Sequence, residues 1–374
     1  MIRLERRVDQ PAWLKVAVPA GSVLAALVAG AVLLTVTGHD ALDTYQLLLE
    51  RGFTSQGAFT ATLTAATPLL FTGLCAAVAF RMRVFNIGGE GQLIMGAVGA
   101  SAAGIALGDG PLAITVLGMV LAGAACGAVW AAIAGALRAW ANTNEIITTL
   151  MLNYVAANLA TYLVFGSESY WRKLDGTGKM FPQGKPIAEG AHWPTVDFGN
   201  FTVGFGFFLG SVIAIGLFVL FRSTRFGFQV RVIGDEPRAA RYAGMRTKRA
   251  VFGLMALSGA IAGIGGASDV GDTRYVLDPK ALQQAGYGYA GIVVAALARL
   301  NPIAVVFVAV LMGGLANAGR ALQGPDFPAG LVGTLQGLLL LFTLAGELFA
   351  RYRVRRVVVE HAEASPAGAS GATA

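Results

Sequence analysis

Amide and phenol side chains are the groups in this sequence that could bind a ligand from within otherwise apolar stretches. They form one set: Asn153, Tyr154, Asn158, Gln283, Tyr287 and Tyr289. Such groups hydrogen-bond to an uncharged polar solute, and the aromatic faces can stack against it. Because no fixed counter-charge accompanies them, the set suits a nucleoside or a sugar better than a charged solute. Hydrogen bonds between neighbouring helices would explain each residue singly.

A second group of polar side chains lies beside closely spaced glycines. Phe85, Asn86, Glu90 and Gln92 belong to the segment 81–96, which runs from a basic turn into a weakly apolar stretch. Polar groups next to flexible backbone favour a gate or the start of a broken helix on a solute pathway. A turn that caps the following helix would explain the same composition without transport.

Residue patterns for catalysis are absent from the sequence. It holds no G-x-x-x-x-G-K-[ST] motif, so the chain does not hydrolyse a nucleotide through a P-loop. His39, His192 and His361 fall in expected loops or in the tail, and none has a partner at metal-ligand or nucleophile spacing. We therefore expect no enzyme activity, and no metal or cofactor on this chain.

The composition indicates which elements must position these side chains. Hydrophobic residues make up 55% of the chain and charged residues only 13%, about half the usual share of ~25%. The mean hydropathy is +0.64, and uncharged stretches recur along nearly the whole sequence, which is typical of a multi-pass membrane protein. The net charge of +7 is then explained by cationic cytoplasmic loops rather than by nucleic-acid binding.

The apolar stretches predict an all-α membrane domain over residues 16–350 with about ten transmembrane helices, each near the ~20 residues that cross a bilayer. They are 16–37, 60–80, 93–107, 111–137, 146–165, 203–221, 250–268, 281–298, 302–319 and 328–350. With both termini in the cytoplasm, most of the 28 Lys and Arg residues fall on cytoplasmic segments. The regions near 87–107 and 281–298 are weakly apolar and glycine-rich, which favours broken or re-entrant helices there.

The segments outside the helices complete this organisation. Residues 1–15 form a cytoplasmic N-terminal segment, and 351–374 form a tail that is first basic and then of disordered composition. The loop 166–202 lies outside and is either a docking surface or a spacer. Because no span carries an ionisable residue in its middle, we expect no proton relay. Sodium coupling through backbone carbonyls at broken helices remains open.

The cytoplasmic loop 222–249 is the candidate for an energy input, and it holds eight basic and two acidic residues. Asp235 can cap a short helix, Pro237 suits its first turn, and Gly244 suits a left-handed end. Its docking face for a cytoplasmic ATPase would consist of small residues and one cation: Ala239, Ala240, Arg241 and Ala243. A surface helix that only follows the positive-inside rule is the alternative.

Small residues in the apolar stretches are expected to serve packing. Glycines four residues apart let helices approach closely, and three pairs occur: Gly123/Gly127, Gly206/Gly210 and Gly259/Gly263. Cys75 and Cys126 also lie in apolar stretches, where free, buried thiols are expected.

Four motifs resemble those of permease subunits of bacterial ABC importers. They are Phe85-Asn-Ile-Gly-Gly-Glu-Gly-Gln92, Thr143-Asn-Glu-Ile-Ile-Thr-Thr-Leu-Met-Leu-Asn-Tyr154, Gly286-Tyr-Gly-Tyr-Ala-Gly-Ile-Val-Val-Ala-Ala-Leu297 followed by Asn301-Pro302, and the A-A-x-x-x-G pattern of Ala239, Ala240 and Gly244. Over roughly residues 60–345 the chain resembles the branched-chain amino acid/ribose permease superfamily, and within it the nucleoside and simple-sugar branch.

This resemblance implies a multi-pass subunit of the bacterial plasma membrane that forms the translocation pathway for a nucleoside or simple sugar. It further implies a second permease, identical or not, a cytoplasmic ATPase that binds the ATP, and an extracytoplasmic solute-binding lipoprotein. The chain departs from the family pattern at Ala290, where a bulkier residue is common, and in its long loop 166–202. A free-standing facilitator, a sodium-coupled carrier, or a membrane anchor without a solute path are the competing functions.

Overall fold

The predicted all-α architecture is confirmed by a computed structural model that describes residues 2–6, 13–322 and 330–356. The described helices, in chain order, are α1 (Leu14–Val36), α2 (Ala41–Leu49), α3 (Ala58–Phe80), α4 (Gly89–Leu107), α5 (Leu112–Ala141), α6 (Glu145–Thr161), α7 (Phe205–Ser223), α8 (Arg225–Asp235), α9 (Pro237–Tyr242), α10 (Thr247–Ser268), α11 (Pro279–Ala285), α12 (Tyr287–Leu297), α13 (Pro302–Leu322) and α14 (Gly330–Arg351). The tail beyond residue 356, expected to be disordered, lies outside the described residues.

Short irregular elements extend or connect these helices. π-helical turns follow α2, α6 and α10, at Glu50–Thr54, Tyr162–Gly166 and Asp269–Arg274. Two 3-10 turns lie in the loop 166–202, at Gly176–Lys179 and Glu189–Ala191. Two antiparallel ribbons complete the fold: β1 (Ile2–Arg6) with β4 (Tyr352–Arg356), and β2 (Thr195–Asp197) with β3 (Thr202–Gly204). The β1–β4 pairing holds the two described ends of the chain side by side, as two termini on one side of a membrane require.

Seven of the described helices are long and apolar enough to cross a membrane, and there are eight spans if the pair formed by α1 and α2 counts as one. That pair bends by 118° between residues 36 and 41. The count is lower than the predicted ten, although every predicted stretch coincides with a helix or a helix pair. One reason is that 281–298 is divided between α11 and α12, of seven and eleven residues.

The two regions expected to be broken differ in the structure. Near 281–298 the interruption is present, and Gly286 sits at the break with a left-handed φ of +59°. Near 87–107 the helix itself is unbroken, because α4 runs continuously from Gly89 to Leu107. The irregular backbone lies just before it, over residues 81–88, and reaches into the protein.

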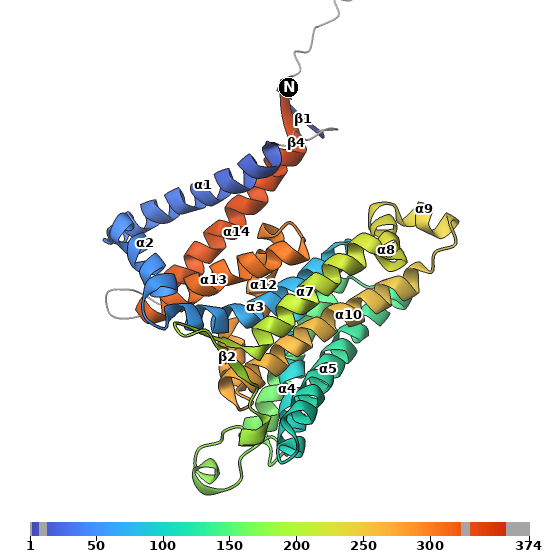
Figure 1. The fold of residues 1–374 in the computed structure, drawn as a ribbon. Helices are drawn as coiled ribbons and strands as arrows, with labels where there is room; N and C mark the ends of the chain where they lie inside the picture. Colours follow the sequence, from blue (N-terminus) through green and yellow to red (C-terminus); the bar gives the residue numbers. More distant parts are fainter. Residues whose placement is uncertain (1, 7–12, 323–329, 357–374) are drawn as a thin grey trace, which may run out of the picture.

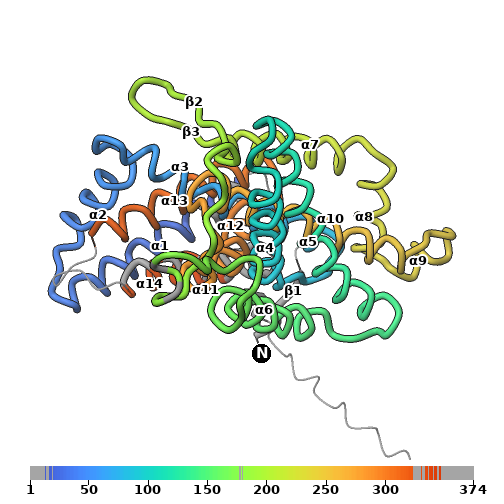
Figure 2. Tube along the Cα trace, turned by 90° about the horizontal axis from the view of Figure 1, so that it is seen from below, coloured from blue at the N-terminus to red at the C-terminus, as the bar shows by residue number. Residues whose placement is uncertain are grey.

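The helix α3 lies at the centre of the bundle, and 89% of its membrane-length window is buried. Its side chains Leu70, Phe71 and Leu74 are fully covered. The helices α7, α10, α12 and α13 pack around it, and α4 and α5 pack on α10 (Figure 1). The helices α1 and α14 pair with each other at the edge of the bundle, as the view from below also shows (Figure 2).

The two ends of the bundle differ in charge. The segment with α8 and α9 lies at one end, together with cations at the ends of α3, α5 and α7: Arg81, Arg138 and Arg222. The loop 166–202 lies at the opposite end (Figure 1), with the buried carboxylate of Asp269 and the partly buried one of Asp272. This polarity agrees with the topology that charge counting predicts.

The loop 166–202 is packed onto helix ends rather than extended. Its backbone bridges to the segment after α10 through Pro186 and Val276, and the backbone N–H of Trp193 donates to the Gly271 carbonyl at 3.0 Å. The indole of Trp171 donates to the Val98 carbonyl of α4 at 3.0 Å. The loop therefore ties together the ends of α4 and α10 at this end of the bundle.

Glycines allow α4, α5 and α10 to touch through their backbones, as predicted for the pairs on α5 and α10. A Cβ on Gly263 would lie 2.2 Å from the carbonyl oxygen of Gly123, and one on Gly127 would lie 2.3 Å from that of Gly259. On α4, a Cβ on Gly96 would lie 2.3 Å from the Gly263 Cα. The pair Gly206/Gly210 is likewise packed against neighbouring side chains. Close packing of this kind holds helices together where lipid removes the hydrophobic driving force.

We predict that Gly263→Ala destabilises the protein, because its methyl group must push α5 and α10 apart. Overpacking of this kind costs about 1–3 kcal/mol. Gly253→Ala on the same helix is the matched control, since nothing lies within 4 Å of its Cβ position and alanine favours helix by up to ~1 kcal/mol. Thermal unfolding in detergent measures both variants. Equal melting temperatures for the two would contradict this account of the contact.

Candidate functional site

The segment 81–88 and the first turn of α4 enclose a buried network of amides. Asn86 and Gln92 bond reciprocally, with both nitrogen-to-oxygen distances at 2.9 Å. The Asn86 amide also donates to the Ser258 hydroxyl of α10 at 2.9 Å, and that hydroxyl donates to the Cys75 carbonyl of α3 at 2.8 Å. Both amide side chains are only 1% exposed. In this conformation they therefore hold α3, α4 and α10 together rather than face a solute.

The helix α6 supplies the hydrogen-bond partners for the irregular backbone before α4. Glu145 accepts from the Phe85 N–H at 3.3 Å, and Thr149 accepts from the Ile87 N–H at 3.3 Å. Asn153 accepts from the Gly91 N–H at 2.9 Å. These three acceptors are four residues apart and so lie on one helix face.

Asn153 has further partners besides the Gly91 amide. Its side-chain nitrogen donates to the Ile87 carbonyl at 3.0 Å and lies 3.4 Å from the Tyr289 hydroxyl. Asn153 is 3% exposed, whereas Tyr289 is 44% exposed. The amide is therefore mainly a backbone clamp, and Tyr289 connects it to the exposed surface.

Glu90 joins the beginnings of two helices. It is the second residue of α4, it is 5% exposed, and its Oε2 accepts from the Gly288 N–H in the first turn of α12 at 2.5 Å. A carboxylate is stabilised near helix N-termini, where the helix dipole is positive. A Cβ on Gly288 would lie 2.1 Å from the Glu90 nitrogen, so glycine is needed for this approach. The other oxygen, Oε1, is buried and has no hydrogen-bond partner among the described residues.

Three predicted pathway residues lie on the exposed face of α6 and α11 instead of in this network. Tyr154 is 60% exposed, and Asn158 is exposed and donates to the Tyr154 carbonyl at 2.8 Å. Gln283 is exposed on α11 and donates to the Ala157 carbonyl at 3.2 Å and the Thr161 hydroxyl at 3.0 Å. Together with Tyr289 they form a row of uncharged polar side chains, which we call the polar row: Tyr154, Asn158, Gln283 and Tyr289.

The two remaining predicted pathway residues lie apart from the polar row. Phe85 is 45% exposed, and its ring centroid lies 5.3 Å from that of Phe80. Tyr287 is partly buried between the two main apolar clusters, and its carbonyl accepts from the Thr72 hydroxyl at 2.9 Å.

Sequence reasoning missed several residues of the site. The acceptors Glu145 and Thr149 could have been found, because with Asn153 they repeat every four residues on a predicted helix. Ser258 gives no such signal, since it is an isolated serine in an apolar stretch. The ion pair of Asp269 and Arg274, at 2.8 Å, was missed because the predicted span ended at residue 268, one turn before the π-helical end of α10.

The short helix predicted within the loop 222–249 is present as α9, with one correction at its start. Glu236, not Asp235, caps it, through a 3.4 Å bond from the Arg238 N–H. Asp235 instead ends α8 and forms an exposed ion pair with Arg83 at 3.2 Å. Pro237 occupies the first turn as predicted, and Gly244 follows the helix with a φ of +75°.

The small residues of α9 do not share one face. Ala240 is fully buried, whereas Ala239 and Ala243 are exposed together with Arg241. Tyr242 is 94% exposed, and α9 lies clear of the bundle (Figure 1). The exposed part of α9 is thus available to another molecule.

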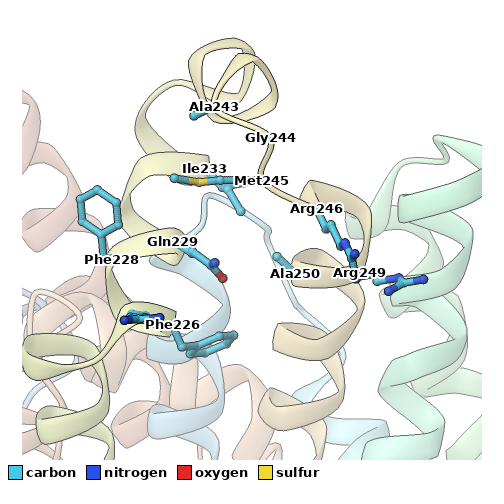
Figure 3. A pocket seen from close by; sticks show the side chains of 11 residues that line it. Phe226, Phe228, Gln229, Ile233, Ala243, Gly244, Met245, Arg246, Arg249 and Ala250 are labelled. Atoms are coloured by element: carbon cyan, nitrogen blue, oxygen red, sulfur yellow. The ribbon is translucent and has the colours of Figure 1, made fainter.

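A groove of about 640 Å³ lies between α8 and the start of α10, next to α9 (Figure 3). Its lining combines apolar side chains with arginines: Phe226, Phe228, Ile233 and Met245, with Arg225, Arg246 and Arg249. An apolar groove with a cationic rim suits a protein partner with an apolar anchor and acidic neighbours.

The fold and the site define a multi-pass membrane protein that carries uncharged polar groups along one face. Comparison with known proteins makes this class specific. The chain matches the family described as branched-chain amino acid transport system / permease component over residues 58–344, and it belongs to that family.

Three relatives resemble the chain over most of their length. It is 32% identical to the glucose ABC transporter permease protein TsgB13 of Haloferax volcanii, covering 100% of this chain and 98% of that protein. It is 32% identical to the guanosine ABC transporter permease protein NupP of Bacillus subtilis, covering 87% and 92%. It is 28% identical to the nucleoside ABC transporter permease protein NupB of Lactococcus lactis, covering 88% and 90%.

We predict that Asn153→Leu lowers stability, because it leaves the Gly91 N–H and the Ile87 carbonyl buried without partners. Each unsatisfied group costs about 1–3 kcal/mol. Asn158→Leu is the matched control, since that amide bonds only to a carbonyl of its own helix, in the part of the chain that the structure describes. Thermal unfolding of the detergent-solubilised protein should show a clear loss for the first variant only. Wild-type melting of Asn153→Leu would refute its role as a clamp.

Proposed function

We propose that this chain is the transmembrane permease subunit of an ATP-binding-cassette importer and forms the translocation pathway for a nucleoside or related simple sugar. The relatives whose names refer to guanosine, nucleosides and glucose support this substrate class. The chain itself would hold no cofactor, and ATP would be bound by a separate ATPase subunit.

The observation that carries the proposal is the polar row. Amides exposed on the face of a membrane helix are costly against lipid, so they face another protein or a water-filled path. Asn158 and Gln283 are exposed in the single chain, and their side chains are uncharged. A second permease packed against this face, identical or not, would enclose a path lined by groups that bond to hydroxyls and nucleobase edges.

The energy input in this proposal arrives through α9 and the neighbouring groove. A free-standing carrier gains nothing from a short cationic helix held clear of its bundle, whereas a cytoplasmic ATPase can bind one in a cleft. At the opposite end, the packed external loop offers a fixed surface to an extracytoplasmic solute-binding lipoprotein. Its exposed apolar side chains, Met180 and Phe181, are 80% and 72% accessible.

Uptake in a deletion strain tests the proposed substrate and path. The wild-type gene should restore accumulation of one neutral class among purine nucleosides, pyrimidine nucleosides, ribose and glucose. Asn158→Leu should reduce that uptake at least tenfold while melting as wild type, because it removes a wall amide without disturbing the fold. Wild-type uptake by this variant would exclude Asn158 from the path, and concentrative uptake by the lone chain in liposomes would exclude the importer function itself.

Removing the two arginine charges of α9 is expected to weaken binding of the ATPase subunit to this chain. Arg238 and Arg241 are exposed, and Ala240 beneath them is untouched by the change. Arg238→Gln with Arg241→Gln should lower the amount of co-purified ATPase about tenfold and abolish uptake. Arg222→Gln with Arg231→Gln removes the same charge from exposed surface at the same end of the bundle, outside α9 and the groove, and serves as the control. Equal ATPase recovery in both double variants would argue against α9 as the docking element.

A further inference from the structure

A second cavity, of about 630 Å³, lies where α5 ends and α10 begins. Its lining consists of one aromatic ring, one thioether and four polar or cationic side chains: Trp140, Met245, Arg246, Thr247, Lys248 and Arg249. It lies at the same basic end of the bundle as α8 and α9. It shares Met245, Arg246 and Arg249 with the groove in Figure 3, and its other lining residues are Trp140, Thr247 and Lys248.

The positive charge in this cavity is not balanced by the protein. Arg246, Lys248 and Arg249 lie within four residues at the N-terminus of α10, where no side chain caps the helix. No carboxylate lies within 4 Å of any of the three in the described residues. Because a helix N-terminus is itself positive, an anion bound at this cluster would be stabilised both by the cations and by the helix dipole. Figure 3 shows Arg246 and Arg249 on the side of α10 that faces α5.

An aromatic ring marks the level of the membrane surface beside these cations. Trp140, in the last turn of α5, is 55% exposed, and its ring packs edge-on against Phe252 of α10 at a centroid distance of 5.4 Å. Tryptophan is enriched at the boundary between lipid tails and headgroups. The cavity therefore sits at headgroup depth.

An exposed apolar stripe leads from the cavity along α5 toward the middle of the membrane. Val129, Ile133 and Leu137 are 64%, 40% and 39% exposed, and they precede Trp140 on one side of the helix. From residue 129 to residue 140 the helix rises about 16 Å, which matches half of the ~30 Å hydrocarbon core. The stripe is as long as one acyl chain in one leaflet.

We propose that this cavity binds the anionic headgroup of a phospholipid of the cytoplasmic leaflet, with an acyl chain along the α5 stripe. The cations lie at headgroup depth and adjoin the apolar stripe, so together they complement a molecule with a charged head and an apolar tail. A soluble protein partner would contact the cations but not the stripe, which lies within the membrane. Basic pockets between membrane helices on the cytoplasmic side bind such headgroups. The site involves neither the polar row nor α9, so it stands independently of the transported solute.

Fluorescence quenching tests the site on the membrane complex purified through this chain. The complex is placed in phosphatidylcholine bilayers that contain increasing fractions of brominated phosphatidylglycerol, and Trp140→Phe isolates the signal of this indole. Quenching of Trp140 should saturate at a low fraction of phosphatidylglycerol. Each cation near the surface contributes about fivefold to affinity. Lys248→Gln, which leaves the lining of the groove in Figure 3 unchanged, should therefore weaken the binding about fivefold.

The controls separate a lipid from other anions and from the ATPase. Arg238→Gln with Arg241→Gln should leave the quenching unchanged, and Lys248→Gln should keep its ATPase. Wild-type quenching in the Lys248→Gln variant, or equal quenching by brominated phosphatidylcholine, would overturn the proposal. So would displacement of the lipid by millimolar inorganic phosphate, or loss of the ATPase from the Lys248→Gln variant.

Discussion

Every backbone amide that is removed from water inside a membrane must find its partner within the protein, and this constraint organises the structure. Residues 81–88 are the place where it is hardest to meet, because their backbone is irregular and reaches into the bundle. The helix α6 meets it with a ladder of side-chain acceptors, Glu145, Thr149 and Asn153, each one helical turn from the next. Side chains repeated along a regular helix thereby provide hydrogen-bond partners for the backbone N–H groups of an irregular segment.

Once the start of α4 is fixed, the other contacts of the centre follow. Glu90 reaches the first turn of α12, and Asn86 reaches α10 through Ser258. Glycines then bring α4, α5 and α10 into backbone contact. These contacts join segments on both sides of the break at Gly286, so the centre of the bundle holds together despite an interrupted helix. The pair α1–α14 lacks such a network in the described residues and lies at the edge.

Much of this organisation could be predicted from composition and spacing. Hydropathy located the long apolar helices, because lipid imposes length and apolarity directly on the chain, but it gave no signal for α2 or α8. Gly244 and Pro237 marked α9 correctly, since their backbone preferences are local. The direction in which a side chain points could not be predicted as well. Asn153 and Asn158 are chemically identical and lie in the same predicted span, yet one clamps backbone and the other is exposed.

Two predictions about helix ends and breaks were wrong because neighbouring helices decide these features. Near 87–107 glycine content suggested a broken helix, but α4 is continuous because its glycines serve close packing on α5, α6 and α10. Asp235 was expected to cap α9, but the chain extends α8 through that residue and leaves the cap to Glu236. The course of the preceding helix decided that choice.

The continuity of α10 has a mechanical consequence. With its π-helical end it runs unbroken over Thr247–Arg274, about 40 Å at 1.5 Å per residue. Its C-terminal end is bonded to the loop 166–202 through the Trp193 N–H and the Gly271 carbonyl. Its N-terminal end begins a few residues after α9. It can therefore transmit a displacement along the bundle: a shift at the end near the loop 166–202 moves the end near α9, because no break interrupts the helix. The glycine contacts would pass such a displacement on to α4 and α5, because they leave no gap between the helix backbones.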